Sequence, residues 1–167
     1  KYLMSRVFGG NNKADMAIRP TWNLLKGSIQ DLYSGGNEGR MINKLGLLLE
    51  IGKKNTDGSI IPSDIEVYNV YGGCRKADVR PLYPEGANIG KDVASSEVTI
   101  NTLGYKFPAG LPARVLIRSG NINNVYGGND VTGRVYGGNA IGVYTSISGN
   151  VYGGGNGSYA YTDNANL

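Results

Sequence analysis

One short word recurs six times along this chain and constrains its fold more than any other feature. The word is an apolar residue, an aromatic residue and then, directly or after one residue, a pair of glycines. Self-similarity of this kind marks repeat architectures, in which each repeat buries its apolar face against its neighbours. The sequence therefore predicts stacked, similar segments. The copies begin at Val7, Leu32, Val70, Val125, Val135 and Val151.

The spacings between successive copies are 25, 38, 55, 10 and 16 residues. A spacing of 25 suits one turn of a stack of short strands. The longer spacings suit a turn plus an insertion, or two turns. A spacing of 10 is too short for a full turn, so the copies at Val125 and Val135 are predicted to occupy different faces.

Adjacent residues of a strand point to opposite sides, so the word predicts its apolar residue inside and its tyrosine outside. In three copies a further apolar residue precedes the word by three positions: Ile29, Val67 and Ile122. Strict strand alternation gives even spacings. An odd spacing that keeps both residues on one side therefore predicts a bend or bulge between them.

The glycine pair of the word is expected to adopt positive φ at a tight corner. The asparagine that often follows is expected to bond to the same amide one turn away, forming a ladder. Both predictions concern structural repeat positions. These positions are Gly9, Gly10, Gly35, Gly36, Asn37, Gly72, Gly73, Gly127, Gly128, Asn129, Gly137, Gly138, Asn139, Gly154, Gly155 and Asn156.

The predicted fold is all-β, an irregular parallel β-helix or β-solenoid with loop insertions, forming a single domain over residues 1–167. A β-sandwich or propeller is the alternative, because propeller blades also repeat Gly-aromatic motifs. A longer echo, Lys13-Ala14-Asp15 against Lys76-Ala77-Asp78, suggests sub-blocks 1–69 and 70–167.

Residues 41–52 are compatible with one short helix or with a strand buried on both faces. The Pro-, Gly- and Asn-containing segments 53–63 and 81–95 are predicted to be surface loops.

The composition excludes several classes of function. The net charge of +4 is scattered along the chain, whereas nucleic-acid binders concentrate positive charge on one face. No apolar run approaches the ~18 residues of a membrane span. The first residues lack the apolar core of a signal peptide, so we expect either that it has been removed or that the chain is a piece of a larger protein. Nucleic acid and membrane insertion are therefore not expected as partners.

Catalytic chemistry finds little support. The chain has no histidine, which removes the Ser-His-Asp triad, the usual zinc sites and the commonest general base. Its Asp and Glu residues form no pair that spacing singles out. The single cysteine, Cys74, is an unpaired thiol, an intermolecular partner or, as the preferred interpretation, a small buried hydrophobe. We expect no catalytic residue, no metal and no cofactor.

Two sets of residues are candidates for weak ligand binding. Tyr126, Tyr136 and Tyr152 are predicted to stack as an outward aromatic column, whose rings either stiffen the fold or contact a sugar or protein. Trp22 either stacks on a sugar or covers the end of the core. The second set either grips an acidic or hydroxylated ligand or pins a loop through local bonds. It comprises Lys13, Asp15, Lys76, Asp78 and Arg80.

The words "NVYGGN" and the stretch "SGNVYGGGNGSYAYTDN" resemble the Gly-Tyr-Asn-rich repeats of proteins secreted or surface-displayed by Bacteroides-like gut bacteria. Such repeats are similar to right-handed parallel β-helices of the pectin-lyase-like superfamily. The resemblance implies an exported bacterial protein, extracellular or on the cell surface, and transfers no catalytic residue.

The expected function is a non-catalytic, adhesin-like or structural module. Its expected partners are neighbouring repeats of the same parent protein and a glycan or a host or cell-surface protein. The alternative is a polysaccharide-active enzyme, a lyase or glycoside hydrolase of β-helix type.

Overall fold

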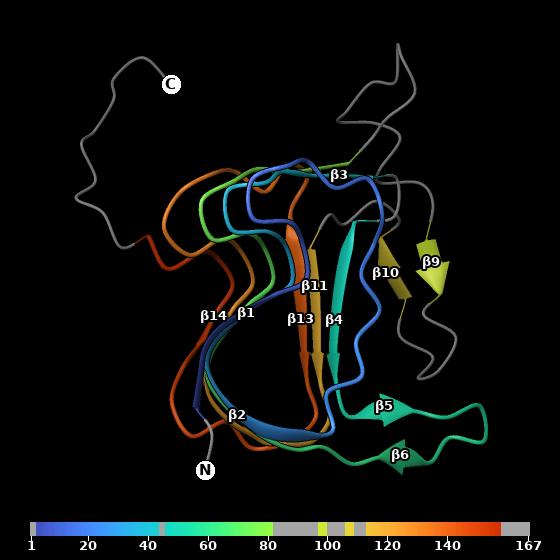
Figure 1. The fold of residues 1–167 in the computed structure, drawn as a ribbon. Helices are drawn as coiled ribbons and strands as arrows, with labels where there is room; N and C mark the ends of the chain where they lie inside the picture. Colours follow the sequence, from blue (N-terminus) through green and yellow to red (C-terminus); the bar gives the residue numbers. More distant parts are fainter. Residues whose placement is uncertain (1–2, 44–45, 82–96, 100–105, 109–112, 158–167) are drawn as a thin grey trace.

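The computed structural model describes residues 3–43, 46–81, 97–99, 106–108 and 113–157, and in these ranges its regular secondary structure is entirely β (Figure 1). The strands are β1 (Leu3–Phe8), β2 (Lys26–Tyr33), β3 (Met41–Asn43), β4 (Leu47–Ile51), β5 (Lys53–Lys54), β6 (Ile60–Ile61), β7 (Asp64–Tyr71), β8 (Val79–Pro81), β9 (Glu97–Thr99), β10 (Lys106–Pro108), β11 (Ala113–Ile117), β12 (Asn121–Tyr126), β13 (Asn139–Val143) and β14 (Val151–Tyr152).

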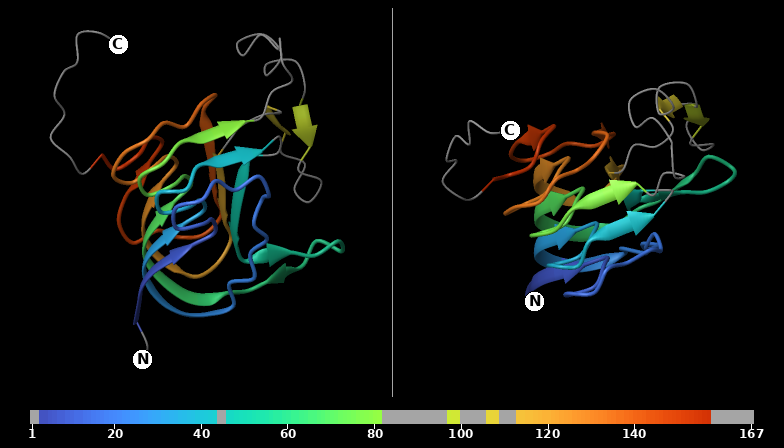
Figure 2. Two further views of the ribbon diagram at one scale, coloured as in Figure 1. Left: turned by 45° about the horizontal axis from the view of Figure 1, so that its top comes forward. Right: turned by 90° about the horizontal axis from the view of Figure 1, so that it is seen from above.

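The main sheet contains five parallel strands in the order β1-β2-β7-β12-β14. They are strands of the repeated word, and equivalent residues of the word pair across the whole sheet. Figure 2 shows them as successive tiers from the blue N-terminal strand to the red C-terminal strand. We call these five positions levels 1 to 5. The aromatic residues that pair from level to level are Phe8, Tyr33, Tyr71, Tyr126 and Tyr152.

Two smaller parallel sheets complete each level. One has the order β13-β11-β4, and the other pairs β3 with β8. Bridges from Met16 to Met41 and from Val79 to Val135 extend the second of these to four levels. The chain thus visits the sheets in a repeating order, and each return to the main sheet adds one level.

The irregular spacings of the word come from insertions. Phe8 pairs with Tyr33 and Tyr33 pairs with Tyr71, although the second separation is 13 residues longer than the first (38 against 25). The antiparallel hairpin β5–β6 lies within this longer segment and projects from the body (Figure 1). The still longer segment between Tyr71 and Tyr126 carries the antiparallel pair β9–β10. The longer spacings are therefore single levels with insertions.

The two closely spaced copies lie on different sheets, as predicted. Val125 belongs to the main sheet, where it pairs with Val70 and Val151. Val135 instead forms a bridge with Val79 of β8.

The apolar residue of each central word faces the core, as predicted. Leu32, Val70 and Val125 are fully buried. The preceding residues Ile29, Val67 and Ile122 are buried with them. The strand pairing skips the residue between each apolar pair and its neighbour, at positions 30, 68 and 123, which agrees with the predicted bend. The main core also includes Leu49, Ile51, Ile65, Val115 and Ile117.

A second, smaller cluster lies under β3 and β8 and contains Cys74 together with Met41, Leu47 and Val79. Cys74 is a free thiol and is fully buried, and burial raises the pKa of this thiol to about 11. Its placement confirms the interpretation as a buried hydrophobe. Trp22 packs against the main core, which agrees with the interpretation that it covers the end of the core.

Residues 41–52 form the two strands β3 and β4, so the helical alternative is wrong. Gly46 separates them with a φ of 66°, a conformation that ends a strand at little cost only for glycine. Of the two predicted loops, 53–63 forms the β5–β6 hairpin, whereas residues 82–95 lie outside the described residues.

The predicted reason for the glycine pairs is wrong for the five stacked copies. Positive φ occurs at Gly137 and Gly138 of the sixth copy but at none of the paired glycines of the other five. Close approach of successive levels is the actual reason. A Cβ added to Gly72 would lie 2.4 Å from the carbonyl oxygen of Gly127, and one added to Gly127 would lie 2.5 Å from that of Gly153.

Candidate functional site

An aromatic stack follows the main sheet through all five levels. Successive ring centroids are 4.7 to 4.9 Å apart, and the ring planes are within 13° of parallel. This spacing equals the ~4.8 Å separation of neighbouring strands, so in-register pairing alone places ring on ring. The stack comprises Phe8, Tyr33, Tyr71, Tyr126 and Tyr152.

The predicted aromatic column is correct for two of its three residues. Tyr126 and Tyr152 stack directly on each other. Tyr136 does not join them, because its copy of the word lies on the other sheet; the Arg80 guanidinium lies 4.4 Å from its ring centroid instead. Exposure changes along the stack: Tyr33 and Tyr71 are buried, whereas Tyr152 is 45% exposed.

A polar ladder runs beside the stack, two residues before each aromatic ring. The Asn69 side-chain amide donates to Oδ1 of Asp31 at 2.9 Å, and the Asn124 amide donates to Oδ1 of Asn69 at 3.1 Å. Arg6 forms an ion pair with Asp31 at 3.7 Å, and the backbone N–H of Asn150 donates to Asn124. Polar side chains at one position of the word thus connect all five levels.

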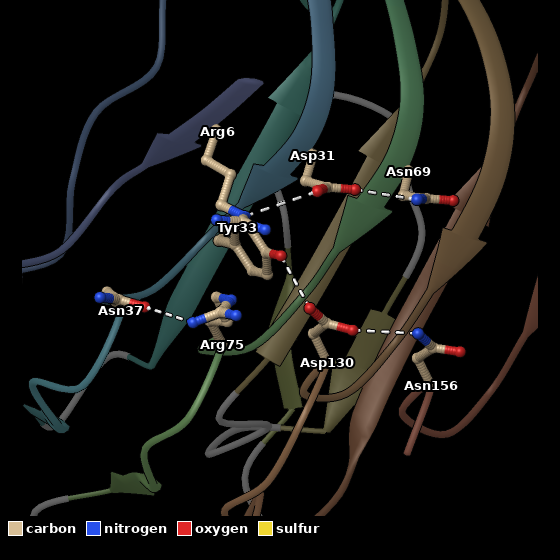
Figure 3. Close-up of polar contacts among 8 residues, drawn as sticks. All are labelled: Arg6, Asp31, Tyr33, Asn37, Asn69, Arg75, Asp130 and Asn156. Carbon is tan, nitrogen blue, oxygen red and sulfur yellow. Dashed lines mark hydrogen bonds and ion pairs between the residues drawn. The ribbon is translucent and has the colours of Figure 1, made fainter. Parts of the chain in front are cut away.

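A second polar column follows the glycine pair, as Figure 3 shows on the other side of the Tyr33 ring. The Asp130 carboxylate accepts a hydrogen bond from the Tyr33 hydroxyl at 2.7 Å and another from the Asn156 amide at 3.0 Å. In the same column the Arg75 guanidinium donates to Asn37 at 3.3 Å, and Asn37 donates to Asn12 at 2.7 Å. Asp130 is 8% exposed, so its bonds are made largely out of water.

This environment disfavours ionisation of the stacked tyrosines. Burial, followed by the hydrogen bond to Asp130, raises the pKa of Tyr33. Burial and the nearby negative charge of Asp130 raise the pKa of Tyr71 in the same direction. Burial is also the main cause of the raised pKa of Tyr126. These phenols therefore stay neutral and donate hydrogen bonds; they are poorly suited to act as bases.

The predicted amide ladder exists, but at other positions than those predicted. The asparagines that follow the glycine pair differ in role: Asn37 bonds to Asn12, whereas the buried Asn129 accepts from the backbone of Cys74 and donates to Ala77. Asn139 begins β13. The amide-to-amide contact between levels is made by the asparagines that precede the word, in the ladder through Asn69.

Asp15 and Asp78, from the long echo, occupy equivalent positions at levels 1 and 3. Asp15 accepts hydrogen bonds from the guanidinium and backbone N–H of Arg40, which lies at level 2. Asp78 accepts from the backbone N–H of Arg134 at 2.9 Å. This position therefore alternates acidic and basic side chains, and both carboxylates hold neighbouring segments, which agrees with the interpretation that they pin loops.

Three predicted ligand residues lie apart from that contact. Lys13 and Lys76 are exposed. Arg80 is also exposed and packs on Tyr136. The structure does not gather them into one pocket.

Sequence reasoning missed most of the residues that connect the levels. Phe8, Tyr33 and Tyr71 carried a clear signal, since each is the aromatic residue of a word. Asp31 carried a weaker one, because it lies two residues before an aromatic residue as Asn69 and Asn124 do. Asp130 carried none, since its partner Tyr33 lies 97 residues away in the sequence.

The described carboxylates of the site have protein partners. Besides Asp31 and Asp130, Glu50 forms an ion pair at 3.0 Å with Arg118, whose side chain is 2% exposed. In the part of the chain that the structure describes, no three His, Cys, Asp or Glu side chains gather as a metal site. No helix in those residues is long and apolar enough to cross a membrane.

Three hollows mark the described surface. One of about 370 Å³ lies at the C-terminal end, beside Asp130 and Gly155. One of about 290 Å³ lies along the main sheet and includes Tyr68. One of about 170 Å³ lies between Trp22, Arg19 and Lys53.

Comparison with known proteins yields no relative: no family model, curated protein or solved structure matches this chain.

Proposed function

We propose that the chain is a non-catalytic β-solenoid module of a secreted or cell-surface bacterial protein, with an adhesin-like or structural role. The observation that carries this proposal is the stack through Tyr33 and Tyr71. Faces of aromatic rings are the surfaces that a ligand would contact, and here they are used between levels.

Several features support a solenoid in place of a sandwich or propeller. The three largest contact areas between strands are parallel pairs of the main sheet, β2 with β7, β7 with β12 and β1 with β2. Sandwiches and propeller blades are built from antiparallel strands. A chain that adds one level for each return to the main sheet also gains stability from nearest-neighbour contacts, as repeat proteins do.

A structural role agrees with the state of the polar groups. A glycosidase requires two carboxyl groups about 5–9.5 Å apart that are free to act on the sugar. Asp31 and Asp130 instead accept hydrogen bonds that join levels. The export of the protein and its location on the cell surface rest on the resemblance of the repeated words.

Incubation of the pure protein with acidic and neutral polysaccharides tests the absence of catalysis. We expect no release of unsaturated or reducing ends above the level of a heat-denatured control. Reproducible product that is lost in Asp31→Asn or Asp130→Asn, with folding retained, would establish the enzyme alternative instead. Protease treatment of intact producing cells tests the location, and protection of the protein from the protease would contradict it.

A further inference from the structure

A groove of about 290 Å³ follows the bends of β2, β7 and β12. It lies on the same main sheet as the aromatic stack, at the positions that the strand pairing skips: Gln30, Tyr68 and Asn123. The groove spans three levels and reaches the segment before β14. Its lining consists of Ser28, Ile29, Gln30, Glu66, Val67, Tyr68, Asn121, Asn123 and Ser148.

Tyr68 is the aromatic residue of this groove, and it differs from the stacked tyrosines. Its side chain is 53% exposed. Among the described residues its ring takes part in none of the aromatic contacts that build the stack. Its faces are therefore available to a ligand, whereas those of Tyr33 and Tyr71 are covered.

The amides of the groove are likewise available. Within the described residues, no hydrogen bond occupies the side-chain amides of Gln30, Asn121 and Asn123. The amides of Asn69 and Asn124, one position along in the neighbouring column, are bonded to each other. A side-chain amide offers two donors and an acceptor, so three free amides beside an exposed ring form a surface rich in hydrogen-bonding groups.

The charge of the groove selects among ligands. Glu66 is the one charged side chain of the lining, and a carboxylate repels anions while it accepts hydrogen bonds from hydroxyl groups. Levels repeat at ~4.8 Å, a distance close to the length of one sugar unit. Equivalent side chains at successive levels would therefore meet successive units of a linear chain.

We propose that this groove binds a neutral, linear glycan that runs across the levels, with one sugar ring packed on Tyr68 and its hydroxyl groups bonded to Gln30, Asn121, Asn123 and Glu66. The proposal goes beyond the structural role above, which the aromatic stack carries independently of any ligand.

Binding of soluble neutral oligosaccharides, measured by isothermal titration calorimetry, tests the proposal. The probes are linear oligomers of glucose, mannose and xylose, and oligogalacturonate serves as the acidic comparison. The variants are Tyr68→Ala and Asn123→Ala. The matched control is Tyr152→Ala, which removes a tyrosine of similar exposure that lies in the stack and outside the groove.

We expect at least one neutral oligomer to bind, and oligogalacturonate not to bind. Tyr68→Ala should weaken binding by about tenfold, the loss of one aromatic contact, at an unchanged melting temperature. Asn123→Ala should weaken it less, and Tyr152→Ala should leave it unchanged.

Three outcomes would overturn the proposal: no binding of any neutral oligomer, equal binding by wild type and Tyr68→Ala, or a loss of binding in Tyr152→Ala as large as in Tyr68→Ala. Preferred binding of the acidic oligomer would also contradict it. None of these outcomes touches the proposed structural role, whose tests are cleavage assays and measurements of stability.

Discussion

The Tyr33 hydroxyl donates a 2.7 Å hydrogen bond to Oδ2 of Asp130, although the two residues lie at levels 2 and 4 of the sheet. The bond passes beside the intervening Tyr71 ring, which stacks on Tyr33 at 4.8 Å. One carboxylate thereby links the aromatic stack to the column that follows the glycine pair. It connects three levels, since Asn156 of level 5 donates to its other oxygen.

The first prediction concerns this link. Asp130→Ala leaves the buried Tyr33 hydroxyl without its acceptor, and an unsatisfied buried donor costs about 1–3 kcal/mol of stability. We expect urea denaturation followed by circular dichroism to give a loss in that range. Asp57→Ala is the control, because Asp57 is exposed and bonds only to Ser59 of its own hairpin. Equal losses in both variants would show that the link contributes nothing specific.

The second prediction uses two glycines at the same position of the word. A Cβ on Gly72 meets the backbone of the next level at 2.4 Å, whereas a Cβ on Gly153 meets nothing within 4 Å. Neither residue has positive φ, so conformational freedom cannot explain a difference between them. Gly72→Ala should destabilise by about 1–3 kcal/mol, the cost of overpacking. Gly153→Ala should melt like wild type; similar melting of both variants would refute close approach as the reason for the glycine.

These glycines illustrate what the sequence could predict. A word repeated at spacings of 25, 38 and 55 residues predicted parallel, in-register levels with insertions, because identical residues stack well only in register. It did not distinguish glycines that need positive φ, such as Gly137, from glycines such as Gly72 that allow backbones to approach, because both requirements select the same residue.

Side-chain partners were harder to predict. Tyr136 shares its word with Tyr126 but lies on another sheet, because the 10-residue spacing changes the sheet and the letters do not record it. The contact between Tyr33 and Asp130 depends on how far a segment folds back across two levels. Tyr68 belongs to no word, and only its position at a bend distinguishes it from a core tyrosine.

The third prediction concerns pH. Hydrogen bonds from the Arg40 guanidinium hold the pKa of the Asp15 carboxyl below its ordinary value of 3.8. A carboxyl with a depressed pKa in the folded state contributes stability above its unfolded pKa, and this contribution is lost as the pH falls through the folded pKa. The difference in melting temperature between wild type and Asp15→Asn should therefore be constant from pH 7 to about 5 and should shrink between about pH 4 and 2.

Arg40→Gln removes the partner of Asp15 and should reproduce that pH profile. High salt should reduce the difference at neutral pH, because the pair is exposed and salt screens it. A difference that stays the same down to about pH 2 would mean that Asp15 acts through its shape and hydrogen bonds alone.

The account rests most on the aromatic stack as the element that holds the levels together. The measurement that tests it most directly is the free energy of unfolding of Tyr71→Ala, Tyr126→Ala and Tyr152→Ala, obtained by urea denaturation. The account predicts a gradient that follows burial: about 3–5 kcal/mol lost at Tyr71, as for other buried aromatic residues, less at Tyr126, and under about 1 kcal/mol at the half-exposed Tyr152. Equal, small losses at all three positions, with Tyr71→Ala as stable as Tyr152→Ala, would contradict it.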